Sequence, residues 1–278
     1  MTKTALNTFI ATIIFMLFTG YSAQAQFLSC GTRVTAEQVA LENSFVPVDS
    51  VHNLHKTFPV AVYIVKNQAG NTGYSEAQLN TVLGELNQNF KPSGLQFSAC
   101  SIQVVDNYNY DIINPDNLSE LTALYFKPHV INLYIVSELY DADYVPVCGL
   151  TWMPEANKNV ILIRKDCSLT ASLTHQMGHF FGLYHTHEEA FGKSKADDSD
   201  CATTGDFCCD TPAQPILSGK VDATCIYTAA ETDTDGNYYV PSVKNFMSLG
   251  RPECQCSFTH DQYVRMTNVF LKYKKDLW

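Results

Sequence analysis

Apolar residues along the chain follow two kinds of spacing, and each predicts a different element. Residues 58–65 form an unbroken apolar run, Phe-Pro-Val-Ala-Val-Tyr-Ile-Val, which is typical of a strand buried on both faces. Residues 75–90 place apolar side chains at every third or fourth position behind Ser75, a residue type favoured as an N-cap. We therefore expect a strand followed by a helix. The apolar positions of that helix are Leu79, Val82, Leu83, Leu86 and Phe90.

Further apolar segments complete the expected sheet. Residues 95–105 alternate like a strand, and shorter apolar runs predict strands at 130–136, 148–153 and 160–163. Residues 261–274 carry an apolar face at helical spacing and close the chain as a helix. This order predicts a twisted sheet backed by helices, with a histidine-bearing helix beneath its edge.

The N-terminus has the pattern of a secretory signal peptide. Lys3 supplies a positive charge, Phe9–Phe18 is an apolar stretch too short to span a bilayer, and Ala23-Gln24-Ala25 fits a cleavage site. We expect residues 1–25 to be removed, a mature chain that begins near Gln26, and an extracytoplasmic location. The alternative is an uncleaved membrane anchor. No later segment is long and apolar enough to span a membrane, and residues 26–55 are expected to form an irregular lead.

The number and the positions of the cysteines are those expected of an exported protein. All ten follow the predicted cleavage site, and an even number in an exported chain predicts a disulfide framework whose pairing the sequence leaves open. Cys208 and Cys209 are neighbours and fit a mutual disulfide poorly. A zinc–thiolate cluster is the alternative, for which Cys254 and Cys256 lack a matching second pair. Residues 188–250, rich in Asp, Thr, Gly and Cys, are expected to be loops held by disulfides. The cysteines are Cys30, Cys100, Cys148, Cys167, Cys201, Cys208, Cys209, Cys225, Cys254 and Cys256.

The charge of the chain excludes some partners. The formal net charge is −10, and loss of Lys3 with the signal peptide makes the mature chain one unit more negative. Without a Lys/Arg cluster, such a surface argues against nucleic acid and against anionic lipid. About 250 mature residues suffice for one domain with two lobes around a cleft.

Three histidines have the spacing of a metal site. His175 and His179 are four residues apart, so on a helix they project from one face, about 40° apart. Gly182 is free to end that helix with a positive φ, which lets His185 turn back as a third ligand. Three protein ligands leave a fourth position open, as in a catalytic zinc site. The alternative is ordinary histidines on an amphipathic helix; His187 lies outside the pattern and is expected at the surface or behind the ligands.

The histidine motif and residues 245–248, Asn-Phe-Met-Ser, resemble the metzincins, and among them the pappalysin/cytophagalysin family of secreted metallopeptidases. Residues 205–212 (Gly-Asp-Phe-Cys-Cys-Asp-Thr-Pro) and 258–266 resemble two further family segments, so the likeness spans roughly residues 56–278. It implies an α+β, two-lobed zincin fold. The upper lobe, 56–187, would hold a twisted mixed sheet and the zinc-binding helix. The irregular, disulfide-bonded lower lobe, 188–278, would hold the C-terminal helix and a turn whose Met247 passes beneath the zinc.

The resemblance also implies disulfides and calcium in the lower lobe. By chain order it pairs Cys201 with Cys225, and one of Cys208 and Cys209 with one of Cys254 and Cys256. Calcium ligands are expected among three residues, since calcium takes carboxylate and carbonyl oxygens. Solvated loop acids are the alternative. The three residues are Asp206, Asp210 and Thr211.

Two positions depart from the family pattern. Gln176 stands where the family has the glutamate that acts as general base, and an amide neither accepts nor delivers a proton usefully at neutral pH. Loss of such a base typically lowers rates ~10²–10⁴-fold. Leu249 stands where the family usually has a tyrosine that supports the tetrahedral intermediate, and removing one such donor costs ~10²–10³-fold.

We therefore expect a secreted, zinc-binding member of a metallopeptidase family that is hydrolytically impaired and binds peptide or protein ligands in its cleft. The alternative is an active zinc metalloendopeptidase with an unorthodox base, for which Glu188 and Glu189, after the third histidine, are the candidates. A third class, a protein that keeps the fold without zinc, conflicts with the presence of all three histidines. Metal content and a peptide-cleavage assay separate the three.

Overall fold

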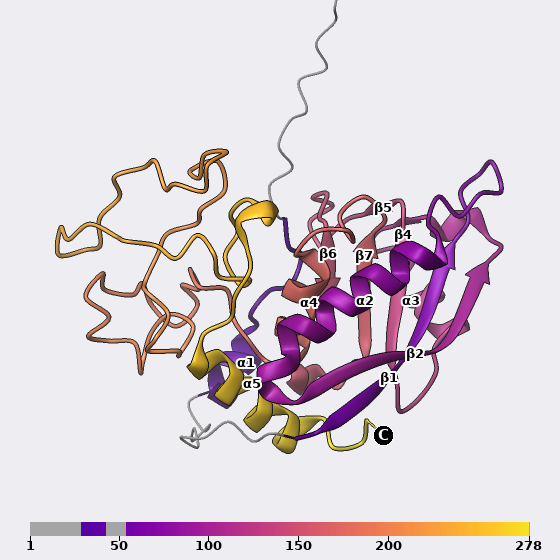
Figure 1. The fold of residues 1–278 in the computed structure, drawn as a ribbon, viewed down its shortest axis with the longest axis horizontal. Helices are drawn as coiled ribbons and strands as arrows, with labels where there is room; N and C mark the ends of the chain where they lie inside the picture. The colour runs from indigo at the N-terminus through magenta and orange to yellow at the C-terminus, as the bar shows by residue number, and fades with distance from the viewer. Residues whose placement is uncertain (1–28, 43–53, 278) are drawn as a thin grey trace, which may run out of the picture.

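A five-stranded mixed sheet forms the centre of the computed structural model, which describes residues 29–42 and 54–277 (Figure 1). The strand order is β2–β1–β4–β7–β6, in which β6 is an antiparallel edge strand and every other pairing is parallel. The predicted signal peptide and its cleavage site lie outside the described residues. The strands are β1 (Lys56–Val65), β2 (Leu95–Val105), β4 (Ile131–Val136), β6 (Gly149–Thr151) and β7 (Val160–Arg164).

The sheet explains the unbroken apolar run of β1. Phe58, Val60 and Val62 point into one hydrophobic core, whereas Tyr63 and Val65 join a second core on the opposite face. Successive side chains of a strand alternate between faces, so a strand covered on both sides is apolar throughout. The predicted mixed sheet is confirmed.

Helices cover both faces of the sheet. Helices α2 (Glu76–Phe90), α4 (Ser172–Phe180) and α5 (His260–Tyr273) pack in the core on the Phe58 face, and α3 (Leu118–Leu124) packs on the other. Helix α2 begins at Ser75 as predicted, with a capping box closed by Gln78. Shorter elements are strands β3 (Ile112–Ile113) and β5 (Glu138–Leu139), and 3₁₀ turns at Lys91–Ser93, Tyr108–Tyr110, Pro154–Ala156 and Pro252–Cys254.

The N-terminal lead is more ordered than its sequence predicts. Helix α1 (Ala36–Glu42) forms within it, capped by Thr35, whose Oγ1 accepts from the Gln38 N–H at 3.3 Å. The lead was expected to be irregular over residues 26–55, and for residues 36–42 that prediction is wrong. The helix has only seven residues, so its apolar pattern is too short to stand out in the sequence.

Residues 188–250 form loops, as expected, but the disulfides of the lower part of the chain differ from the predicted pairs. Cys201 bonds Cys209 rather than Cys225, and Cys225 bonds Cys254, so both pairings inferred from chain order are wrong. Cys201 and Cys209 lie in one tight loop with their Cα atoms 5.1 Å apart, a proximity that chain order does not reveal. The Cys254 disulfide also excludes the alternative of a zinc–thiolate cluster that contains Cys254. A third disulfide joins Cys148 to Cys167, and the free cysteines are Cys30, Cys100, Cys208 and Cys256.

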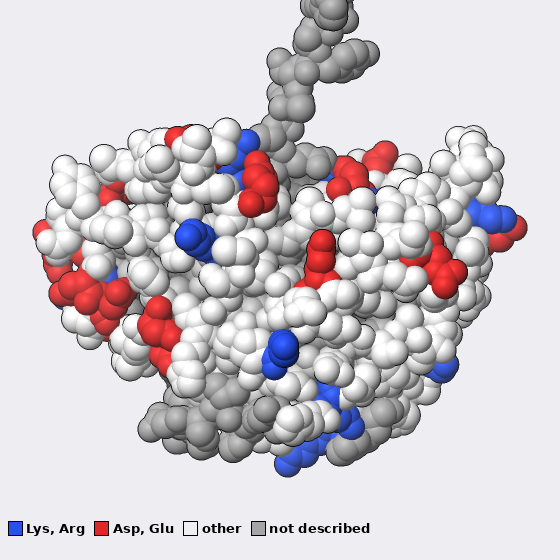
Figure 2. All heavy atoms as spheres, viewed as in Figure 1, with Lys and Arg blue, Asp and Glu red and all other residues white. Residues whose placement is uncertain are grey.

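Acidic side chains are spread over the face drawn in Figure 2 and gather over the loops that follow α4, at the left of the view. Lysine and arginine side chains on this face are fewer, and several of them lie near the lower edge of the view. The described helices include none that is long and apolar enough to cross a membrane.

Candidate metal centre

Helix α4 and the turn after it bring the three histidines together. His175 and His179 project from one face of the buried helix, and Gly182 ends the turn with φ +87°. A side chain at Gly182 would also meet Val269 of α5, since a Cβ there would lie 2.8 Å from both Val269 methyl carbons. Both constraints require glycine. The chain then turns back and places His185 beside the other two rings.

Backbone carbonyls fix the protonation of two of these rings. His175 Nδ1 lies 2.7 Å from the Phe246 carbonyl oxygen, and His179 Nδ1 lies 2.7 Å from that of Leu183. A carbonyl oxygen only accepts, so each Nδ1 carries the hydrogen and each Nε2 keeps a free lone pair. The two Nε2 atoms are nevertheless 3.0 Å apart, and His179 Nε2 is 3.1 Å from His185 Nε2. Lone pairs that face one another so closely suit a shared cation.

The spacing and protonation fit a metal ion. Two nitrogens on one tetrahedral zinc at about 2.0–2.1 Å stand roughly 3.3 Å apart, close to the distances found here. Burial lowers the pKa of His175 to about 4 and holds the pKa values of His179 and His185 well below the ordinary value. All three rings are therefore neutral at physiological pH, the form that binds metals.

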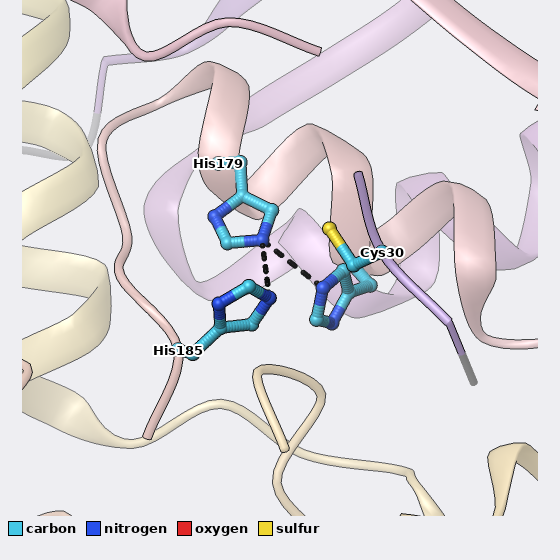
Figure 3. Close-up of side chains that lie close together, drawn as sticks. Cys30, His179 and His185 are labelled. Carbon is cyan, nitrogen blue, oxygen red and sulfur yellow. Dashed lines mark hydrogen bonds between the residues drawn. The ribbon is translucent and has the colours of Figure 1, made fainter. Parts of the chain in front are cut away.

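A fourth side chain, which the sequence analysis did not assign to the site, joins the histidines. Cys30 Sγ and the three histidine nitrogens all lie within 4.8 Å of one another (Figure 3). Burial raises the pKa of the Cys30 thiol, and a hydrogen bond from Gln176 opposes that rise. Thiolate and imidazole are both preferred zinc ligands. Within the described residues, the group contains no Asp or Glu.

Residues 29–33, here called the N-terminal arm, carry Cys30 along the free edge of β6. The Cys148 N–H donates to the Ser29 carbonyl and the Gly31 N–H to the Gly149 carbonyl, both at 2.9 Å. Gly31 permits this approach, because a Cβ there would lie 3.1 Å from Leu150. Arg33 then forms ion pairs with two acids of the β5–β6 loop, Asp141 and Asp143. The arm thus occupies the exposed edge of the sheet beside the histidines.

The side chain of Gln176 extends from helix α4 to the arm and is fully buried. Its Nε2 donates to Cys30 Sγ at 3.2 Å, and its Oε1 is 3.1 Å from Thr32 Oγ1. The glutamine at the base position therefore contacts the arm on both sides of its amide.

Met247 lies beneath the histidines, where the resemblance puts it. Its side chain is fully buried, and the Phe246 carbonyl before it accepts from His175. Gly178 of α4 sits directly on Met247: a Cβ on Gly178 would lie 2.5 Å from the methionine sulfur. The turn thus supports the metal centre from below.

Replacing Gly178 by alanine should lower the free energy of unfolding by about 1–3 kcal/mol, since a buried methionine must be displaced. The matched control is Gly84→Ala in α2, where an added Cβ meets nothing within 4 Å. There the higher helix propensity of alanine should stabilise by up to ~1 kcal/mol. Urea denaturation of both variants tests the contrast. Equal stabilisation by the two changes would contradict tight packing of Met247 on α4.

Other residues named from the sequence lie around the centre. Leu249 is partly exposed two residues beyond Met247 and has no hydrogen-bonding group. His187 stacks on the His185 ring at 4.9 Å, behind the ligands. Glu188 turns one carboxylate oxygen to the Ala190 N–H at 2.9 Å, and neither Glu188 nor Glu189 belongs to the Cys–His group.

The three residues expected as calcium ligands do not share one environment in the structure. Asp206 is buried, with Oδ1 accepting from the Cys208 N–H at 3.1 Å and Oδ2 without a hydrogen-bond partner. Thr211 lines the same small pocket, and its Oγ1 is 3.3 Å from Thr259 Oγ1. Asp210 instead accepts from the Asp261 N–H at 3.0 Å, at the first turn of α5.

Comparison with known proteins places the fold and the site in context. The sequence model of peptidase family M43, described as "Pregnancy-associated plasma protein-A", matches residues 124–271, which is more than half of the chain. An extracellular metalloprotease of Sordaria macrospora is 25% identical over 276 residues, covering 88% of this chain and 89% of that protein. Another from Arthroderma gypseum is 26% identical, with coverages of 88% and 84%. Mature mirolysin of Tannerella forsythia, solved with a cleaved peptide, has a TM-score of 0.52 at 19% identity, covering 77% of this chain and 91% of that one.

Proposed function

Because this chain belongs to peptidase family M43, the pappalysin family of metallopeptidases, we propose that it is an exported zinc-binding protein in which peptide hydrolysis is impaired. Export is supported by the signal-peptide pattern of residues 1–25 and by the curated relatives, which are named extracellular metalloproteases. The mature chain would begin near Gln26 and so would keep Cys30 and the arm.

His175, His179 and His185 are the proposed zinc ligands. Their Nε2 atoms converge with lone pairs free, and the rings are neutral at physiological pH. Zinc bound in such a site would supply Lewis acidity and would lower the pKa of a bound water. Gln176 is not proposed as a ligand, because its amide faces Cys30 and Thr32.

The observation that carries the proposed impairment is the chemistry at position 176. A working peptidase needs a group there that takes a proton from water and returns it to the leaving amine. The Gln176 amide does neither at neutral pH, and its two polar atoms are already engaged with the arm. Leu249 offers no donor to a developing oxyanion. The lack of a base at position 176, the engagement of the Gln176 amide with the arm and the lack of a donor at Leu249 all oppose hydrolysis.

A cleavage assay tests this proposal. The chain without residues 1–25, loaded with zinc, is incubated with a denatured protein and with a quenched fluorescent peptide library, with and without a chelator. We expect no chelator-sensitive cleavage. Robust chelator-sensitive cleavage would overturn the impairment and favour the second candidate, an active endopeptidase with a substitute base.

Peptide or protein ligands are the proposed partners, as the family fold suggests. The arm lies along β6, so a ligand seated on that edge must displace it. Next to the arm is a largely apolar cavity of about 500 Å³, to which Leu118, Trp152 and Met153 contribute. An apolar cavity beside a sheet edge suits side chains of an extended peptide.

Calcium is proposed at Asp206, since the buried Oδ2 lacks a partner. Burial raises the pKa of Asp206 to about 7, above its value in an unfolded chain. Without metal, the stability that depends on the protonated carboxyl is complete below about pH 4 and is lost as the pH rises through about 7.

Asp206→Asn should therefore stabilise the metal-free protein at pH 8 and change little at pH 4, because the amide stays neutral. Millimolar calcium should raise the melting temperature of the unmodified chain at pH 8 and leave that of Asp206→Asn unchanged. Thermal unfolding at the two pH values measures both effects. If millimolar calcium does not raise the melting temperature of the unmodified chain at pH 8, the calcium proposal is wrong.

A further inference from the structure

Helix α5 contains buried polar side chains that its packing in the core does not explain. Gln262 and Arg265 are three residues apart, so they lie on one face of the helix, and both side chains are buried. Val269 continues that face and lies against Gly182, the glycine that ends the turn after α4. This face of α5 therefore lies against the part of the chain that carries the histidines.

Gln262 forms a two-way amide pair with Asn245, the residue that opens the turn of Met247. Asn245 Nδ2 donates to Gln262 Oε1 at 3.1 Å, and Gln262 Nε2 donates to Asn245 Oδ1 at 3.2 Å. Asn245 Oδ1 also accepts from the Met247 N–H at 2.8 Å, so this amide cannot turn over without breaking that bond. Between the two residues lies Phe246, whose carbonyl accepts from His175 Nδ1. Gln262 thus orients the turn that orients His175.

Arg265 contacts the other turn, the one that leads to His185. Its Nε donates to the Gly182 carbonyl at 2.7 Å. Its guanidinium carbon lies 4.6 Å from the centroid of the Tyr184 ring and 5.8 Å from that of Phe207. A cation over the face of a buried aromatic ring is attracted to it. Because Gly182 and Tyr184 are the two ends of the bend that precedes His185, one side chain fixes that bend at both ends.

We propose that Gln262 and Arg265 are positioning residues of the metal site, Gln262 for His175 and Arg265 for His185. Neither residue is a ligand. The inference rests on the proposed zinc binding and deepens it, because groups that orient ligands contribute to the affinity for the metal. Although the three histidines come from one short segment, their arrangement then depends on a helix that follows 83 residues after Gly182.

Gln262→Glu tests the first assignment without removing the helix cap. The Gln262 Oε1 accepts from the Thr259 N–H at 3.0 Å, and a carboxylate at this position of a capping box accepts in the same way. A glutamate lacks the N–H donor, however, and places an oxygen against Asn245 Oδ1. We expect zinc affinity to fall ~10-fold, measured by competition against a chromogenic chelator. Gln78→Glu, at the same position of the α2 capping box, is the matched control and should leave the affinity unchanged.

Arg265→Met tests the second assignment, because methionine keeps the apolar stem and removes the donor and the charge. We expect a ~10-fold loss of zinc affinity. Arg265→Lys keeps a cation and a donor and should recover part of that loss. The matched control is Arg164→Met, whose guanidinium pairs with Asp166, and it should bind zinc as tightly as the unmodified chain.

Double-variant cycles show which histidine each residue acts on. Gln262→Glu should lower zinc affinity ~10-fold in the unmodified chain and in His185→Ala, and it should have no effect in His175→Ala. Arg265→Met should show the reverse dependence, with an effect that persists in His175→Ala and shrinks in His185→Ala. A purely structural loss would lower the affinity equally in both backgrounds, so equal effects would overturn the assignments.

Cobalt substitution gives a second readout. The visible absorption bands of bound cobalt(II) depend on the arrangement of its ligands, so they should shift in Gln262→Glu and Arg265→Met and stay in place in both controls. Unshifted bands in both variants would overturn the proposal. If Arg265→Met does not fold, Arg265→Lys takes its place in the cycle, with the same dependence on His185.

The unmodified chain separates this proposal from the proposed function. If the unmodified chain binds no zinc, the proposed zinc binding fails and the positioning roles fail with it. If the unmodified chain binds zinc, and Gln262→Glu and Arg265→Met bind it as tightly, only the positioning roles are wrong. Peptide cleavage plays no part in these measurements.

Discussion

A chain carrying Gln176→Glu, Leu249→Tyr and Cys30→Ala together should cleave peptides at least ~10⁴-fold faster than the unmodified chain. The glutamate restores a proton shuttle, typically worth ~10²–10⁴-fold, and the tyrosine restores a donor worth ~10²–10³-fold. Removing the Cys30 thiol takes away the side chain that faces the histidines. Initial rates of zinc-loaded enzyme on a fluorogenic peptide, with and without chelator, measure the gain.

The single variants separate the contributions. Gln176→Glu alone should gain less than the triple change, because Cys30 still faces the metal ligands and the arm still covers β6. Leu249→Tyr alone should raise the cleavage rate little, because no general base is restored at position 176. Residues that act on one transition state are not additive, so the triple variant should exceed any single one. A triple variant that binds zinc but is no faster than the unmodified chain would contradict the assignment of inactivity to these positions.

His179→Ala should lower zinc affinity by more than ~10²-fold, since loss of even an outer-shell partner of a ligand typically costs 10–100-fold. His179 Nε2 lies within 3.1 Å of both other histidine nitrogens, so its removal opens the middle of the site. Competition against a chromogenic chelator measures the affinity. The zinc-induced rise in melting temperature should fall with it.

His260→Ala provides the control for His179→Ala. His260 is exposed at the first turn of α5, far from the motif in sequence, and its removal should leave zinc affinity unchanged. Circular dichroism establishes that both variants fold. Zinc binding by His179→Ala as tight as that of the parent would refute the assigned ligands.

Local sequence patterns predicted the elements that carry the site. The apolar run of β1, the N-cap Ser75 of α2 and the spacing of His175, His179 and Gly182 each depend on neighbours a few residues apart. The geometry within a helix or a strand is nearly fixed. Residues at a given spacing in the sequence therefore lie on the same face of the element. The mixed sheet and the helix that carries His175 and His179 therefore follow from the sequence.

The tertiary structure alone decided what meets the histidines. Cys30 precedes Gln176 by 146 residues, and no local pattern marks it as a neighbour of α4. The even number of cysteines gave no sign that four of them stay unpaired, so the sequence held no signal that marks Cys30. Disulfide pairs depend likewise on how loops close in space, which is why chain order misassigned Cys201 and Cys225. Edge-strand pairing by the arm is a long-range contact set by the complete sheet, so the proximity of Cys30 to the histidines becomes visible only in the folded chain.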